Sequence, residues 1–115
     1  MKRSAILAVL LLAGGPGPIA AQQHEDHLTE AQQFGRQLYE KSCGVCHTRP
    51  TMVSGMYGPE LNKNSAGGSE EVMRGVITNG TPRMPGFKYT YDATQIAAIA
   101  SYLKVLEPGH QALNR

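Results

Sequence analysis

The chain contains only two cysteines, and they stand three residues apart in the string Cys43-Gly44-Val45-Cys46-His47. Two cysteines this close together exclude the framework of several disulfides that stabilises many small secreted domains. Large apolar side chains are also scarce, since the 115 residues include two Phe and no Trp, against 13 Gly and 7 Pro. Burial of side chains alone would not readily offset the entropy lost on ordering such a chain. We therefore expect a bulky apolar cofactor to complete the core.

The cysteine string has the C-x-x-C-H spacing that attaches a c-type haem. On a helical turn the sulfurs of Cys43 and Cys46 lie on one side, where each can form a thioether with a haem vinyl group. His47 follows directly and can bring an imidazole nitrogen to the iron, while the small Gly44 and Val45 let the porphyrin edge approach. The pattern predicts one covalent haem c, with His47 as the first axial ligand.

Three other interpretations of the string stay open. A thioredoxin-like redox pair requires a βαβ pattern, which the sequence does not show. A zinc site usually needs a second ligand pair at fixed spacing, and His24, His27 and His110 do not supply one. A local disulfide between Cys43 and Cys46 would leave the neighbouring histidine and the small core unexplained.

The first 21 residues have the layout of a secretory signal peptide. Lys2 and Arg3 precede an apolar run at residues 5–13, and the glycines and prolines at 14–18 then break any helix. This run is too short to span a bilayer, which needs roughly 20 residues. We expect cleavage near Ala21, a periplasmic location and no transmembrane segment in the mature chain. Loss of the two cations removes the net charge of +2, so the neutral remainder lacks the basic footprint of a nucleic-acid binder.

The rest of the chain predicts an all-α domain with long loops. Helix starts are indicated by the capping residues Thr29 (with Gln32), Ser69 and Asp92 (with Gln95). The first helix should run to about Lys41, the second should stop at Asn79-Gly80, and Pro108-Gly109 should end the last. The expected core faces are Ala31, Phe34, Gly35, Leu38 and Ser42, then Val72, Met73, Val76 and Ile77, then Ile96, Ile99, Ala100, Leu103 and Leu106. We expect a flexible N-terminus at 22–28, one domain at 29–107 and a tail at 108–115.

The second axial ligand of the iron decides between an electron carrier and a reactive haem. Met84 is the candidate, because it lies between Pro82 and Pro85 in a loop that can cross to the other haem face. The prolines reduce the entropy lost in holding a weak thioether ligand. Met73 belongs to a predicted helix and is expected in the core. The remaining alternatives are Met52, Met56, His24, His27 and His110.

With these motifs the chain resembles the class I cytochromes c, small electron carriers with one haem, over residues 29–106. Gly35 and Tyr39 correspond to contacts of the family's N-terminal helix, and Ile99 and Tyr102-Leu103 match its C-terminal helix. The resemblance implies a small cytochrome c fold of three to five helices wrapped around one covalently bound haem. It also implies that these two helices cross, with Gly35 permitting a close approach.

The family resemblance further implies that the Pro59 carbonyl accepts the Nδ1 proton of His47, which orients the imidazole and tunes its donor strength. Arg49 and Tyr57 are candidates for contact with a haem propionate. The family's lysine-rich docking ring is not matched, because the basic residues are few and are offset by acids. The candidates for such a ring are Arg49, Lys63, Arg83 and Lys88.

The function implied by the resemblance is transfer of single electrons, without catalysis by the chain itself. Redox partners would be a periplasmic dehydrogenase or quinol-oxidising complex on one side and a terminal oxidase on the other. Such encounters use small, weak interfaces, and the chain would act as a monomer or as a subunit of a complex. The alternative is a haem sensor or peroxidase-like enzyme with an open sixth iron site.

Overall fold

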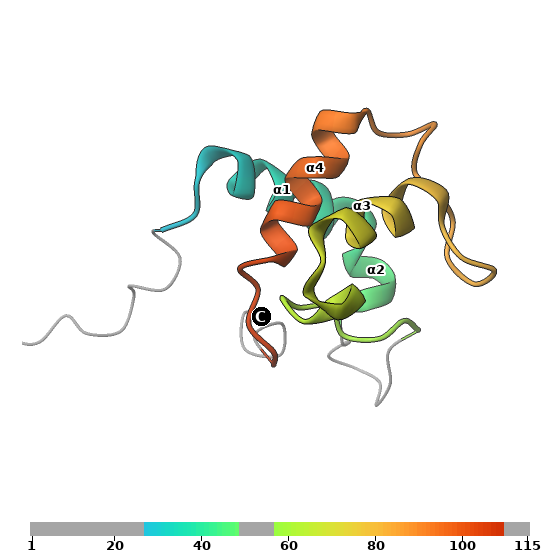
Figure 1. Cartoon of the computed structure of the whole chain (residues 1–115), viewed down its shortest axis with the longest axis horizontal. Helices are drawn as coiled ribbons and strands as arrows, with labels where there is room; N and C mark the ends of the chain where they lie inside the picture. Colours follow the sequence, from blue (N-terminus) through green and yellow to red (C-terminus); the bar gives the residue numbers. More distant parts are fainter. Residues whose placement is uncertain (1–26, 49–56, 110–115) are drawn as a thin grey trace, which may run out of the picture.

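The computed structural model describes residues 27–48 and 57–109. Within these ranges the regular structure is helical, apart from an isolated antiparallel bridge between Thr81 and Met84. The elements are α1 (Glu30–Ser42), α2 (Gly44–His47), the 3-10 helix η1 (Ser65–Gly68), α3 (Glu70–Asn79) and α4 (Ala93–Leu103) (Figure 1). The predicted all-α class is confirmed. The expected signal peptide, most of the expected N-terminal segment and the end of the tail lie outside the described residues.

The helices α1, α3 and α4 begin where the capping residues predict. Thr29 and Gln32 form a reciprocal capping box at the start of α1, with the Gln32 amide donating to Thr29 Oγ1 over 3.2 Å. Asp92 and Gln95 form a second box at α4, with distances of 2.8 and 3.0 Å. Ser69 Oγ accepts from the third amide of α3 over 3.3 Å. These local bonds satisfy amides that a helix otherwise leaves without partners.

Two helix ends match the prediction and one does not. α1 ends at Ser42, one residue beyond the expected Lys41. α3 ends at Asn79, and Gly80 follows with a φ of 72° that favours glycine. α4 ends at Leu103 and does not continue to Pro108-Gly109, so that boundary was wrong. The reason is tertiary, because the Leu106 carbonyl accepts a hydrogen bond from the Lys63 amide over 2.8 Å and the intervening chain tightens into turns.

The crossing of α1 and α4 forms the centre of the domain (Figure 1). Gly35 faces the backbone of Ala98 so closely that a Cβ at this position would overlap the Ala98 carbonyl. The rings of Tyr39 and Tyr102 pack beside this contact with centroids 5.6 Å apart. The close approach expected at Gly35 is therefore confirmed. No helix in the described ranges combines the length and apolar character needed to cross a membrane.

The core faces were predicted well for α4 and less well for the other helices. All five expected core residues around α4 are buried. On α1, Leu38 is buried but Phe34 stays 41% exposed, because the crossing point lies on the adjacent side at Gly35 and Tyr39. On α3, Met73 and Ile77 enter the core and turn Val72 outward, where it is 50% exposed.

Candidate functional site

The cysteine string folds as one helical corner at the end of α1. Ser42 is the last residue of α1, and the Cys43 amide donates to the Tyr39 carbonyl over 2.8 Å. The Cys43 carbonyl then accepts from the amides of Cys46 and His47 over 3.1 and 3.0 Å. Cys43 is thus the hinge between α1 and α2, and both thiols and the imidazole belong to a single turn.

The two cysteines are free and differ in exposure. Cys43 is buried, whereas Cys46 is half-buried. Burial, together with the nearby Cys46, raises the pKa of the Cys43 thiol to about 11. A redox-active pair works through a thiol of lowered pKa, and the buried Cys43 does not supply that thiol. Among the described residues, no cluster of three His, Cys, Asp or Glu side chains is suited to a metal ion, so none supports the zinc alternative.

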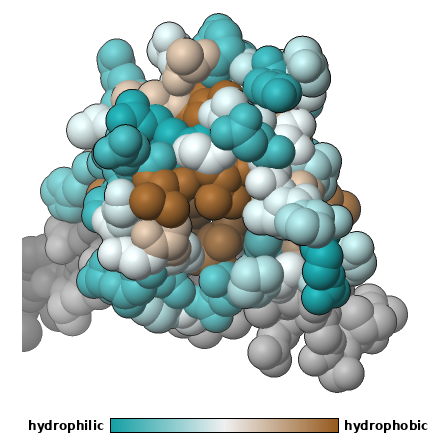
Figure 2. Space-filling view, turned by 45° about the vertical axis from the view of Figure 1, so that its right-hand side comes forward, coloured by the Kyte–Doolittle hydropathy of each residue, from teal (hydrophilic) through white to brown (hydrophobic). Residues whose placement is uncertain are grey.

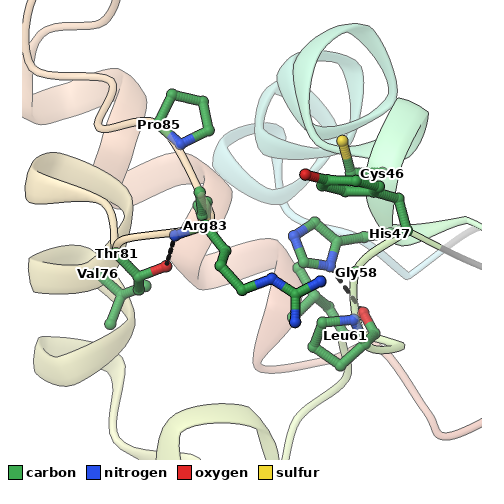
Figure 3. Close-up of a pocket in the computed structure, with 11 residues that line it drawn as sticks. Cys46, His47, Gly58, Leu61, Val76, Thr81, Arg83 and Pro85 are labelled. Atoms are coloured by element: carbon green, nitrogen blue, oxygen red, sulfur yellow. Dashed lines mark hydrogen bonds between the residues drawn. The ribbon is translucent and has the colours of Figure 1, made fainter.

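His47 is buried, and the segment at Gly58 and Pro59 orients its imidazole ring. Its Nδ1 donates a hydrogen bond to the Pro59 carbonyl over 2.7 Å (Figure 3). Because a carbonyl can only accept, Nδ1 carries a proton, and in the neutral imidazole this leaves the lone pair on Nε2. The contact implied by the resemblance is therefore present, and it leaves Nε2 available as a metal ligand.

Gly58 holds the Pro59 carbonyl in this position and was not singled out from the sequence. Its amide donates to the Cys46 carbonyl over 2.8 Å. A Cβ at Gly58 would lie 2.7 Å from Cε1 of His47, closer than real side chains come. In the sequence, the only indication of this role is that a glycine directly precedes Pro59, shortly after the C-x-x-C-H string. Only the packed imidazole shows why that position excludes a side chain.

Met84 lies in a tight turn that leads out of α3. Thr81 and Met84 exchange two backbone hydrogen bonds of 2.8 and 3.2 Å. Farther along, the Phe87 amide donates to the Ile77 carbonyl over 2.9 Å and so returns the chain to the end of α3. Gly80 and Gly86 allow this close return, because a Cβ on either would clash with backbone atoms. Backbone contacts therefore determine where the Met84 side chain begins.

The cysteine corner and the Met84 turn face each other across an apolar hollow. It consists of two adjoining cavities of about 320 and 130 Å³. Residues shared by both cavities are Cys46, His47, Leu61, Met84 and Pro85. Figure 3 shows the turn carrying Arg83 and Pro85 on one side and Cys46 with His47 on the other. In Figure 2, apolar side chains are visible in a hollow bordered by polar groups.

All five predicted site residues border this hollow. Cys43 lines the smaller cavity and Pro59 the larger one, in addition to the shared Cys46, His47 and Met84. Tyr57 also lines the larger cavity. These donors fit a haem, because two free thiols, a lone pair on imidazole and a soft thioether border one largely apolar space.

The alternative ligands do not reach the hollow within the described residues. Met73 is buried in the helical core, as expected, and lines neither cavity. His27 is exposed at the start of the first described range and lines neither cavity. Met52, Met56, His24, His110 and Arg49 lie outside the described residues. Sequence reasoning did not identify the apolar lining residues Leu61 and Phe87, which no motif marks.

Comparison with known proteins agrees with this arrangement. Residues 30–103 match the family described as "Cytochrome C oxidase, cbb3-type, subunit III". Over 73 residues the chain is 34% identical to the 4-cresol dehydrogenase (hydroxylating) cytochrome c subunit of Pseudomonas putida. This match covers 63% of the chain and 59% of the relative's length. The residues matched to the family run from α1 to the end of α4 and include both the cysteine string and Met84.

Proposed function

Because the chain belongs to the family of c-type cytochromes described as "Cytochrome C oxidase, cbb3-type, subunit III", we propose that it is an exported carrier of single electrons with one covalent haem c. Electron transfer is the activity that this family membership supports. The covalent attachment, the axial ligands, the location and the partners are the specific parts of the proposal.

One observation carries the proposal. The cysteine corner and the Met84 turn border the same apolar hollow. In the sequence, Met84 lies 37 residues after His47. In the proposed holoprotein, Cys43 and Cys46 would form thioethers with the haem, and His47 Nε2 and Met84 Sδ would be the ligands of its iron. The haem supplies a metal that alternates between the ferric and ferrous states.

The protein's own groups adjust that chemistry. The Pro59 carbonyl strengthens His47 as a donor by accepting its Nδ1 proton over 2.7 Å. Met84 as a ligand favours the reduced state and raises the potential. The apolar walls exclude water, which also disfavours the extra charge of the oxidised metal. With His47 and Met84 as its two protein ligands, the iron would have no position left for a substrate, so we propose no catalysis by this chain alone.

The partner and location are further parts of the proposal. The similar protein from Pseudomonas putida is named as the cytochrome c subunit of a dehydrogenase. This similarity supports a dehydrogenase as the electron donor here, with the chain as its subunit or as a separate carrier to a terminal acceptor. The signal-like layout of residues 1–21 supports export to the periplasm.

The decisive experiment is expression of the full chain in a periplasm that matures c-type haem. We expect a red protein whose mass equals the processed polypeptide plus one haem. Its oxidised spectrum should show the weak far-red band of methionine-ligated iron, and the reduced protein should not bind carbon monoxide. A colourless product would refute the proposal. Ready binding of carbon monoxide would favour the sensor or peroxidase-like alternative.

A further inference from the structure

Arg83 contributes a fixed charge to a space that is otherwise largely apolar. It lines the larger of the two cavities, whose described lining residues include no Asp or Glu. Figure 3 shows its guanidinium extending from the Met84 turn into the gap beside His47 and Leu61. The ion pairs found among the described residues join Arg36 to Glu40 and Lys63 to Glu107, so neither engages Arg83. Arg83 is exposed, and no ion pair among the described residues gives its guanidinium the carboxylate partner that its planar geometry favours.

The Met84 turn holds the backbone of Arg83 in place. The Arg83 amide donates to Thr81 Oγ1 over 3.3 Å, inside the turn closed by the two Thr81–Met84 backbone bonds. These bonds involve no atom of the arginine side chain. The turn therefore fixes the backbone from which the guanidinium extends into the cavity. A substitution of the Arg83 side chain should leave the hydrogen bonds of this turn intact.

The two cavities differ in the groups that border them. Cys43 lines only the smaller cavity, whereas Tyr57, Pro59 and Arg83 line only the larger one. In a haem, the vinyl groups that react with cysteines and the two propionates occupy opposite edges of the macrocycle. Because Cys43 borders only the smaller cavity, a haem attached there would have its propionate edge toward the larger cavity, which Arg83 borders.

We propose that Arg83 binds a propionate carboxylate of the haem, an inference that rests on the proposed function. The planar guanidinium presents two parallel N–H donors that match a carboxylate. This pair places a neutralising positive charge at the haem edge, beside the residue that binds the iron. Arg83 thereby raises the reduction potential, because it offsets the negative charge that would otherwise stabilise the oxidised metal.

The test uses the full chain matured with haem carrying ¹³C at its propionate carboxylates. Arg83→Gln removes the charge, and Arg83→Lys keeps the charge but loses the fork. Arg74→Gln is the matched control, because Arg74 is exposed on α3 and lines neither cavity. Infrared spectra report the labelled carboxylates directly, and redox titration reports the potential.

We expect Arg83→Gln to shift a labelled carboxylate band and to lower the ratio of reduced to oxidised protein at a fixed poise by about tenfold, or ~59 mV for one electron. Arg83→Lys should shift the band less and keep most of the potential, and Arg74→Gln should change neither. Carboxylate bands that stay in place in Arg83→Gln, or that move equally in Arg74→Gln, would overturn the assignment. Absence of covalent haem from the unsubstituted protein would instead refute the proposed function.

Discussion

The α1–α4 crossing and the apolar hollow beside α2 are held together in different ways. At the crossing, Gly35 meets the Ala98 backbone and the rings of Tyr39 and Tyr102 stand 5.6 Å apart, so protein atoms fill the contact. At the hollow, the facing groups belong to separate segments, each positioned by its own backbone hydrogen bonds. The crossing is thus a contact between protein side chains and backbone, whereas the walls of the hollow meet through the cofactor in the proposed holoprotein.

The largest expected effect comes from detaching the cofactor. Cys43→Ala combined with Cys46→Ala should abolish covalent haem, and we expect the domain to lose most of its helical structure, because the crossing alone buries too little surface. Haem staining after denaturing electrophoresis and far-ultraviolet circular dichroism measure the two losses. Val45→Ala is the control in the same turn, since Val45 is 80% exposed. A folded double mutant would show that the crossing suffices for folding.

Removing the proposed ligand should change the hollow while sparing the crossing. Met84→Ala should keep the covalent haem, open the iron to carbon monoxide and lower the potential by on the order of 0.1–0.2 V, within the ~0.8 V range that axial ligands set. Visible spectra and redox titration measure these changes. Met73→Leu should leave both unchanged, because Met73 lies in the helical core. If Met84→Ala had the same visible spectrum as the parent protein, another residue would have to be the second iron ligand.

A larger side chain at the α1–α4 crossing should reduce stability while leaving the iron site unchanged, the opposite of the Met84 substitution. Gly35→Val should destabilise the protein by ~3 kcal/mol or more, because its side chain would overlap the Ala98 backbone. The iron spectrum of the folded fraction should stay normal. Gly75→Ala is the matched control, since no atom lies within 4 Å of a Cβ built there, and it should stabilise α3 by ~0.5–1 kcal/mol. Chemical denaturation monitored by circular dichroism measures the free energy of unfolding of each variant. Equal stability of Gly35→Val and the parent protein would contradict the expected clash.

The smallest expected effect comes from displacing the Pro59 carbonyl, which lies in the wall of the hollow. Gly58→Ala should push the Pro59 carbonyl away from His47, because the new Cβ would lie 2.7 Å from Cε1. Weakening this hydrogen bond should cost ~1 kcal/mol and raise the potential slightly, since a poorer imidazole donor stabilises the oxidised metal less. Redox titration and the Nδ1 proton resonance of His47 test this. An unmoved resonance would mean that Gly58 is not needed to position Pro59.

The helix starts and the cysteine string were predictable because their rules are local. Thr29 and Asp92 each bond an amide three residues away, and Cys43, Cys46 and His47 share one helical turn. The buried face of α4 followed from a regular spacing of apolar residues. Such interactions depend on a few neighbouring residues, so the pattern alone carries them. The roles of the cysteines, His47 and Met84 toward haem stay predictions.

Contacts between distant segments settled the remaining features. α4 stops at Leu103 because the Lys63 amide engages the Leu106 carbonyl, and no residue near Leu103 marks that end. The outward positions of Phe34 and Val72 depend on the rotation of α1 and α3 against α4. The crowding of Gly58 against His47 and the entry of Arg83 into the larger cavity depend equally on how separate segments meet.

Local hydrogen bonding and residue spacing in the sequence therefore determined where the main helices begin and which residues are proposed to attach a cofactor. Only the tertiary structure decided where α4 ends, which apolar residues face solvent, and which charge and which glycine border the hollow. The physical reason is that capping and periodicity act within about one or two helical turns. Close packing, in contrast, depends on the shapes of surfaces brought together from distant parts of the chain.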